Sequence, residues 1–246
     1  MSTRGSDEEV DSQDLATIVA DAHPQSGSPS MTAPRWRFPL ADRLVANAMG
    51  PELVSKRLVL RGLRPSDFLG WQEVRRRCAD WLLVWEPMRP PGSPDTAENR
   101  RAFEARCEAR DRERAGGTSY GFGIFFDDRF VGECNVNSVQ RGAMQSGYVG
   151  YWVDEIYAGR GFMPEAVVAV MRFGFEQAGL HRLQVSIIPR NLASRRVTEK
   201  LELRNEGVAE RYLEINGKWE DHVRYAITAE EWQQRRAELH GSWLAP

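Results

Sequence analysis

Two glycines one residue apart, Gly159 and Gly161, lie in the stretch Tyr157–Ala166 between a strand-like run and a helix-like run. Glycine lets the backbone turn tightly at such a junction, and the first turn of a helix leaves several N–H groups without an acceptor. Together with the positive end of the helix dipole, these N–H groups attract anions and above all phosphates. Arg160 would add positive charge. The sequence therefore predicts a phosphate-binding turn. The alternative is that the two glycines only allow the backbone to turn tightly.

Composition narrows the possible classes of function. The chain has 246 residues, of which 41% are hydrophobic and 28% charged, and a net charge of −2. This is the balance of an ordinary globular protein without a general bias toward nucleic acid. The three cysteines are an odd number without CxxC spacing, so neither a disulfide framework nor structural zinc is expected. No apolar run is long enough to span a membrane, and we expect a cytoplasmic protein.

The elements that must position these residues are predicted to form one domain, at residues 53–230. Residues 1–33 are rich in Ser, Asp, Glu and Gly and are predicted to be a disordered tail. Residues 34–52 are predicted to be an ordered strap against the domain, and residues 231–246 a C-terminal helical tail.

Hydrophobic periodicity gives the order of the elements. Strands are expected at 57–64, 120–126, 130–137, 147–153, 181–188, 204–215 and 218–227. Helices are expected at 68–81, 96–114, 163–177 and 191–201. Asn216-Gly217, between the last two strands, is a strong hairpin signal. The mixture of helices and mainly sequential strands indicates an α+β protein.

The order of these elements, over about Leu53 to Ile227, resembles the fold of the Gcn5-related N-acetyltransferases (GNAT). Within that superfamily, three stretches resemble the RimJ/RimL group of ribosomal-protein and peptide N-terminal acetyltransferases. They are Trp85-Glu86-Pro87, then Gly150-Tyr151-Trp152 leading into Ala158-Gly159-Arg160-Gly161-Phe162-Met163-Pro164-Glu165-Ala166, and Asn216-Gly217-Lys218-Trp219-Glu220-Asp221-His222. The resemblance implies a mixed, largely antiparallel sheet of six or seven strands, splayed in the middle and flanked by helices. It also implies acetyl-CoA as cosubstrate.

The resemblance assigns roles to residues around the glycine turn. The CoA pyrophosphate would bind the amides of Tyr157, Ala158, Gly159, Arg160, Gly161 and Phe162. Pantetheine would enter between the splayed strands, where an amide near Val153 would stabilise the oxyanion, Asn191 would contact pantetheine while capping its helix, and Ser194 would add a polar contact. The sequence departs from the superfamily at Ile156, where Gln or Arg is usual, and at Thr198, where a catalytic tyrosine is frequent.

Acetyl transfer to an amine requires an uncharged nucleophile. An α-amino group has a reference pKa of about 7.7–8.0 and lysine one of about 10.4, so an α-amine needs only a modest base near neutral pH. Glu133 and Asp221 are the candidate bases. Tyr148 is a candidate acid for the leaving thiolate, with Cys134 and Ser194 as alternatives.

Three further residues are candidates for binding the acceptor. Trp85 and Glu86 lie in an aromatic, proline-stiffened loop, where Glu86 could pair with the α-ammonium of a substrate. His222 lies in the final hairpin and could face the same site. Each residue also has a plainer reading, as loop packing for Trp85 and Glu86 and as an ordinary hairpin side chain for His222.

The leading hypothesis is an acetyl-CoA-dependent transferase that acetylates the N-terminal α-amine of a protein or peptide directly, with a ribosomal protein as the suggested acceptor. No metal, direct nucleic-acid contact or membrane association is expected, and the sequence is compatible with a homodimer. Two alternatives stay open. One is an acetyltransferase for small-molecule amines, and the other is a non-catalytic CoA-binding scaffold.

Overall fold

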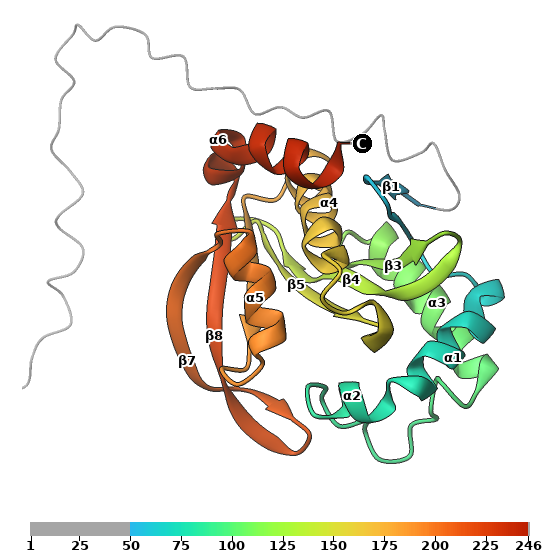
Figure 1. Ribbon diagram of the computed structural model, residues 1–246. Helices are drawn as coiled ribbons and strands as arrows, with labels where there is room; N and C mark the ends of the chain where they lie inside the picture. The colour runs from blue at the N-terminus through green and yellow to red at the C-terminus, as the bar shows by residue number, and fades with distance from the viewer. Residues whose placement is uncertain (1–49, 246) are drawn as a thin grey trace, which may run out of the picture. The chain divides into compact units, whose positions relative to one another are not determined.

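The computed structural model describes residues 50–245, and one eight-stranded sheet organises this part of the chain (Figure 1). The strand order across the sheet is β1-β2-β3-β4-β5-β6-β8-β7. Neighbouring strands are antiparallel except β5 and β6, which are parallel. The strands are β1 (Leu53–Val54), β2 (Val59–Arg61), β3 (Tyr120–Phe126), β4 (Arg129–Gln140), β5 (Ser146–Val153), β6 (Arg182–Ile187), β7 (Arg204–Ile215) and β8 (Lys218–Thr228).

Six α-helices flank this sheet within residues 50–245. They are α1 (Phe68–Arg77), α2 (Ala79–Leu83), α3 (Arg100–Ala115), α4 (Phe162–Glu176), α5 (Leu192–Lys200) and α6 (Ala229–Leu239). Short 3-10 turns at Pro65–Asp67 and Glu155–Tyr157 precede α1 and α4, and a π-helical turn, His240–Leu244, follows α6. No helix in the described part of the chain is long and apolar enough to cross a membrane.

The predicted α+β fold with a mixed, splayed sheet is confirmed, with differences in detail. The sheet has eight strands because β1 adds two residues, too few to show a sequence period. The helix expected at 68–81 breaks at Cys78, whose φ of −95° and ψ of 13° lie outside the helical region. The helix expected at 96–114 begins only at Arg100, because Asn99 is extended and its side chain accepts from the amide of Ala102. The predictions for residues 1–33 and 34–49 lie outside the described residues.

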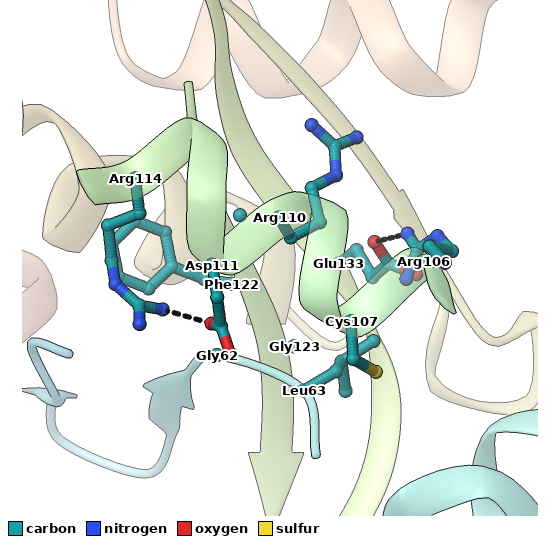
Figure 2. Close-up of a pocket in the computed structure, with 11 residues that line it drawn as sticks. Gly62, Leu63, Arg106, Cys107, Arg110, Asp111, Arg114, Phe122, Gly123 and Glu133 are labelled. Atoms are coloured by element: carbon teal, nitrogen blue, oxygen red, sulfur yellow. Dashed lines mark hydrogen bonds and ion pairs between the residues drawn. The ribbon is translucent and has the colours of Figure 1, made fainter. Parts of the chain in front are cut away.

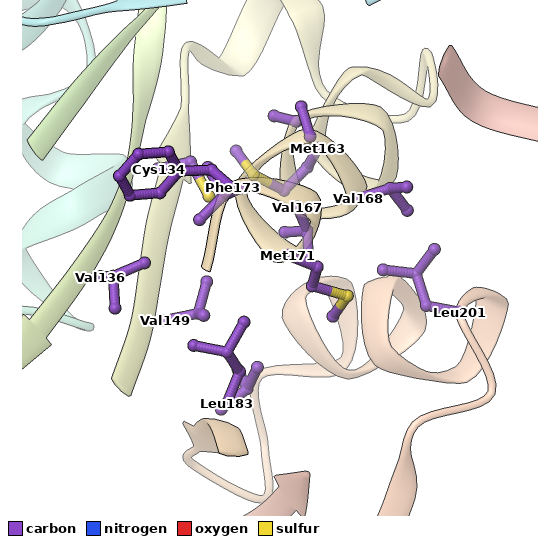
Figure 3. Packing of buried hydrophobic residues seen from close by; sticks show 14 of the residues in the cluster. Cys134, Val136, Val149, Met163, Val167, Val168, Met171, Phe173, Leu183 and Leu201 are labelled. Atoms are coloured by element: carbon purple, nitrogen blue, oxygen red, sulfur yellow. The ribbon is translucent and has the colours of Figure 1, made fainter. Parts of the chain in front are cut away.

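The two faces of the sheet are covered by different helices. Apolar side chains of β4, β5 and β6 pack against α4 (Figure 3); they include Cys134, Val136, Val149 and Leu183, opposite Met163, Val167, Met171 and Phe173. On the other face, α1 and α3 pack over β3 and β4 through a second cluster that contains Trp71, Phe103, Phe125 and Phe130. Since successive side chains of a strand point to opposite faces, Glu133 and Asn135 of β4 belong to the α1/α3 face.

The sheet opens between β5 and β6. The two strands pair only at their beginnings, from Ser146 opposite Arg182 to Tyr148 opposite Gln184. Beyond these pairs β5 continues to Val153 and β6 to Ile187 without pairing to each other. One edge of each strand is therefore free at the centre of the sheet, which is the splay that the resemblance implied.

The final hairpin, formed by β7 and β8, completes one edge of the sheet. Its turn is Asn216-Gly217, with φ values of 47° and 76°, which suits the strong right-handed twist of a tight hairpin. The register of β7 against β8 shifts twice, between Asn205 and Val208 and between Ala209 and Leu213. These irregularities increase the local twist and bring Tyr212 of β7 against His222 of β8.

Candidate active site

The glycine turn presents free backbone amides at the start of α4. Gly159 and Gly161 have φ values of +77° and +79°, and Gly161 is the N-cap of the helix. The amides of Tyr157 and Ala158 are already paired inside the turn, with the carbonyls of Asp154 and Glu155. Within residues 50–245 the next free amides have no acceptor; they are those of Gly159, Gly161, Phe162 and Met163. The amide of Arg160 donates to the carbonyl of Tyr157 at 3.5 Å. Of the six amides predicted to bind pyrophosphate, three are therefore free, those of Gly159, Gly161 and Phe162, and the amide of Met163 joins them.

An ion pair between buried Glu165 and partly exposed Arg57 fixes this turn to the beginning of the sheet. Glu165 of α4 is 1% exposed, and its carboxylate accepts from Ser55 Oγ at 2.8 Å, from the amide of Arg57 at 2.7 Å and from Arg57 Nε at 2.7 Å. Arg57 also donates through Nη1 to the carbonyl of Arg160 at 3.1 Å and lies over the ring of Phe162. The turn is thus held by residues more than a hundred positions earlier, a contact that the sequence alone did not reveal.

A second buried carboxylate holds the other end of the turn. Asp154, which follows β5, accepts from Arg77 Nη2 at 2.5 Å, from the amide of Ile156 at 3.3 Å and from Cys78 Sγ at 3.3 Å. Burial raises the pKa of the Cys78 thiol, so the thiol acts as a hydrogen-bond donor. Asp154 therefore links the glycine turn to α1 through charge-assisted bonds.

The free edge of β5 directs backbone groups into the opening. The amide of Asp154 donates to the carbonyl of Val131 on β4 at 2.8 Å. Because backbone groups alternate in direction along a strand, the N–H and C=O groups of Val153 and Tyr151 point away from β4. They face the gap that β6 leaves, and the amide of Val153 has the direction that the predicted oxyanion contact requires.

The start of α5 forms the other side of the opening. Asn191 caps this helix, with its side-chain oxygen accepting from the amide of Ser194 at 3.0 Å. Ser194 Oγ donates to the hydroxyl of Tyr151 at 3.1 Å, and that hydroxyl donates to the carbonyl of Ser194 at 3.1 Å. Removal of the Tyr151 hydroxyl from water raises its pKa. Tyr151 therefore bridges β5 and α5, which brings Val153, Asn191 and Ser194 to one opening.

Glu133 is bound on both of its carboxylate oxygens. It is 3% exposed and accepts from Trp71 Nε1 at 2.8 Å, Arg106 Nη2 at 2.6 Å and Asn135 Nδ2 at 3.4 Å. Burial by itself would raise the pKa of Glu133, but the Arg106 guanidinium and these hydrogen bonds outweigh it and hold the pKa below its ordinary value. The cavity beside it, under α3, measures about 10 Å³ and holds at most one water (Figure 2). Glu133 is thus placed as an anchor for α1 and α3.

The loop after α2 contacts the final hairpin. Both oxygens of Glu86 accept from Arg75, at 2.6 and 2.7 Å, so this carboxylate is engaged within the protein. The carbonyl of Glu86 accepts from the amide of Asn216 at 3.1 Å, and Arg190 lies over the ring of Trp85. The loop therefore joins the hairpin tip at one margin of the opening.

Six polar side chains gather on the sheet face opposite α4, and we call this group the polar face. Tyr212 is its centre, with its ring 5.7 Å from that of His222 and the Arg224 guanidinium 5.6 Å from the ring centre. Burial, and then the neighbouring Tyr148 hydroxyl, raise the pKa of Tyr212. The members of the polar face are Tyr148, Gln184, Ser186, Tyr212, His222 and Arg224. Of these six residues, Tyr148 and His222 were predicted from the sequence as site residues. Gln184 and Ser186 alternate along β6 with the buried apolar residues Leu183 and Val185, and this pattern could have identified them.

Three other positions considered for acid–base catalysis lie away from the polar face. Asp221 is exposed, on the side of β8 opposite His222, and accepts from the amide of Arg211 at 2.8 Å. Cys134 is fully buried against α4, and burial raises its pKa. Thr198 is buried in α5 and donates to the carbonyl of Arg195 at 2.8 Å. Within residues 50–245 no group of three or more His, Cys, Asp or Glu side chains could hold a metal ion.

Comparison with known proteins agrees with this geometry. The family model of the acetyltransferase (GNAT) domain matches residues 57–204 of this sequence. These residues contain the glycine turn and both sides of the opening. The chain belongs to the GNAT acetyltransferase family. This GNAT chain is 28% identical over 193 residues to the ribosomal protein uS5-alanine N-acetyltransferase of Escherichia coli, an alignment that covers 78% of the chain and 97% of that enzyme.

Two further relatives define the similarity. The solved structure of Mycobacterium smegmatis RimJ in complex with CoA-disulfide superposes with a TM-score of 0.69 at 32% identity, covering 79% of this chain and 93% of that one. The probable N-acetyltransferase YjcK of Bacillus subtilis is 44% identical over 110 residues, which cover 44% of this chain and 61% of YjcK. The resemblance to the RimJ/RimL group is therefore confirmed.

Proposed function

We propose that this chain transfers the acetyl group of acetyl-CoA to the N-terminal α-amine of a protein or peptide, with a ribosomal protein as the acceptor. The observation that carries the proposal is the row of free amides at the start of α4, next to the unpaired edge of β5. The similarity to a ribosomal protein alanine N-acetyltransferase and to a RimJ–CoA complex supports it.

The free amides suit the pyrophosphate of CoA. Charge-assisted hydrogen bonds from Gly159, Gly161, Phe162 and Met163 would each contribute about 1.5–3 kcal/mol. Arg160, whose guanidinium lies over the ring of Tyr157, adds positive charge at the rim. Pantetheine would then extend along the free edge of β5, as an added strand does.

The thioester would lie at the opening between β5 and α5. There the amide of Val153 is directed to stabilise the oxyanion that forms on the acetyl oxygen. Asn191 has its side-chain oxygen committed to the helix cap, which leaves its NH₂ group for a pantetheine carbonyl. Ser194 and Tyr151 close the far side of the opening.

Acetyl transfer here is direct. The uncharged α-amine attacks the thioester carbonyl carbon, the C–N bond forms and the C–S bond breaks. One proton of the amine passes to solvent or a base before attack, and a second passes to the leaving CoA sulfur, so that the products are an acetamide and CoA. An α-amine, with a reference pKa of about 7.7–8.0, is largely protonated at neutral pH and needs help in losing the first proton.

The acceptor would approach from the face opposite α4. The Trp85–Glu86 loop and the tip of the β7–β8 hairpin border that approach. Because Glu86 is paired with Arg75, and Glu133 with Arg106, these carboxylates would orient the walls of the site rather than exchange protons. In this proposal the protein acts in the cytoplasm, and the reaction uses no metal.

Acetyl-CoA turnover with a panel of acceptors tests the proposal. The panel contains peptides with N-terminal Ala, Ser and Met, the same peptides with a blocked α-amine and a free lysine, and polyamines. We expect turnover with free α-amines, best with small first residues, and none with blocked peptides. Turnover on polyamines alone would overturn the proposal in favour of a small-molecule enzyme. CoA binding without turnover of any acceptor would favour a scaffold.

A further inference from the structure

The ring of His222 is fixed in one tautomer by the backbone. Its Nδ1 lies 2.9 Å from the carbonyl oxygen of Glu220. A carbonyl only accepts hydrogen bonds, so Nδ1 carries the proton and the neutral ring has its lone pair on Nε2. Nε2 has no hydrogen-bond partner within residues 50–245. The residue is 3% exposed, and its ring packs edge-on against Tyr212. The ring is therefore held in place while Nε2 stays without a partner.

Strand pairing gives the position of His222 relative to the opening between β5 and β6. Val223, the next residue of β8, pairs with Ile187, the last residue of β6. His222 therefore lies where β6 ends and the gap beside β5 is open. Its side chain points to the face opposite α4, since Val223 belongs to the core that α4 covers. CoA on the glycine turn and an acceptor on the polar face would thus meet from opposite faces of the sheet.

From these observations we infer that His222 Nε2 takes the proton from the α-ammonium of the bound acceptor. The inference rests on the proposed function, because it supplies a base for that reaction. The step converts the α-ammonium and neutral His222 into an uncharged amine and an imidazolium. The amine then attacks the thioester, and the imidazolium releases its proton to solvent after CoA leaves.

The groups around His222 are compatible with this role. On β8 they are Arg224, which lies over Tyr212, and Glu220, whose carboxylate is neutralised by Arg190 at 2.8 Å. From β7 comes Tyr212, and from β5 Tyr148, which neighbours Tyr212. From β6 come Gln184 and Ser186, which do not titrate. The one carboxylate among these groups, that of Glu220, is paired with Arg190.

The variant His222→Asn tests the inference, because an asparagine amide can replace the Nδ1 donor to Glu220 but has no basic nitrogen at Nε2. Rates with an N-terminal Ala peptide would be measured at about pH 7 and about pH 9.5, below and above the α-amine pKa of ~7.7–8.0. We expect kcat to fall about 100-fold at the lower pH, in line with the 10²–10⁴-fold range of general bases. At the higher pH the amine is already uncharged, and the difference should shrink to about 3-fold or less.

Controls separate this outcome from others. His181→Asn changes an exposed histidine that pairs with Glu230 and should leave both rates unchanged. CoA affinity of His222→Asn, measured by calorimetry, should equal that of the wild type, and His222→Gln should lose the same rate if His222→Asn does not fold. A wild-type rate in these variants at the lower pH, or an equal loss at both pH values, would overturn the role of His222 alone. Absence of wild-type turnover with every peptide would instead overturn the proposed function.

Discussion

The glycine turn and the polar face border the same opening, but the chain builds them differently. The turn is one contiguous stretch, residues 159–163, that offers free backbone amides. Two buried carboxylates hold it: Glu165 binds Arg57 in the connection between β1 and β2, and Asp154 binds Arg77 of α1. The polar face consists of side chains from four strands, β5 to β8, assembled around Tyr212. A site made of backbone groups depends on the conformation of the chain, whereas a site made of side chains depends on which residue types are present. Substitutions should therefore affect CoA at the first region and the acceptor at the second.

The largest effect is expected from Gly161→Glu. A side chain at φ +79° is strained, its Cβ would lie 3.5 Å from Arg57 Nη2, and its charge would oppose the pyrophosphate. We expect CoA affinity to fall at least about 100-fold, since roughly 3 kcal/mol of charge-assisted bonding is lost. Calorimetric titration with CoA measures this. The matched variant Gly179→Glu, also at positive φ with nothing near its Cβ, should bind CoA normally, and equal losses in both would contradict the site.

The next effect is expected on stability, from Glu165→Gln. The substitution removes the buried charge that Arg57 and Ser55 bind, while keeping the shape of the side chain. Because Arg57 is partly exposed, the loss should be about 2 kcal/mol, below the full cost of breaking a buried pair. Urea unfolding measures it. The control Glu104→Gln breaks the exposed pair with Arg100 and should cost less than about 0.5 kcal/mol; similar losses would show that the Glu165 pair does not hold the turn.

Glu133→Gln should give a smaller, pH-dependent loss of stability. The Arg106 guanidinium and the hydrogen bonds from Trp71 and Asn135 hold the folded-state pKa of Glu133 below its ordinary value, so the ionised form stabilises the fold at pH values above that ordinary pKa. Near neutral pH the variant should be about 1–2 kcal/mol less stable. As the pH falls through the folded-state pKa, the carboxylate is protonated and the difference should vanish. Urea unfolding from neutral to acidic pH measures this; a difference that persists in acid would mean that the charge of Glu133 is not its cause.

The smallest effect is expected from Asp221→Asn. Its side chain is exposed and bonds the amide of Arg211, and an asparagine oxygen can accept the same bond. We expect kcat and KM for an N-terminal Ala peptide to change less than about 2-fold, as for a surface substitution of under ~0.5 kcal/mol. Steady-state kinetics measure both values. A 100-fold loss of kcat would place a base on the other side of β8 and would contradict the distinction between the two regions.

Most of the fold was predictable because it depends on local patterns. The strand-like runs of β3, β4 and β5, the helical spacing in α4 and the Asn216-Gly217 turn each act within a few residues. The break at Cys78 was not predicted, and there the thiol donates to Asp154, a buried carboxylate 76 positions later, which is a contact that local patterns do not reveal. The two-residue β1 likewise depends on its pairing with β2.

The candidate site divides in the same way. The sequence by itself determined the glycine turn, since two glycines before a helix set the backbone conformation and leave its amides free. Tertiary structure alone decided which amides stay free, which carboxylates are already bound to arginines, and that Tyr212 and Arg224 join His222. The physical reason is range: backbone geometry follows from neighbouring residues, whereas the partners of a buried charge or ring are set by strands that meet only after the sheet has formed.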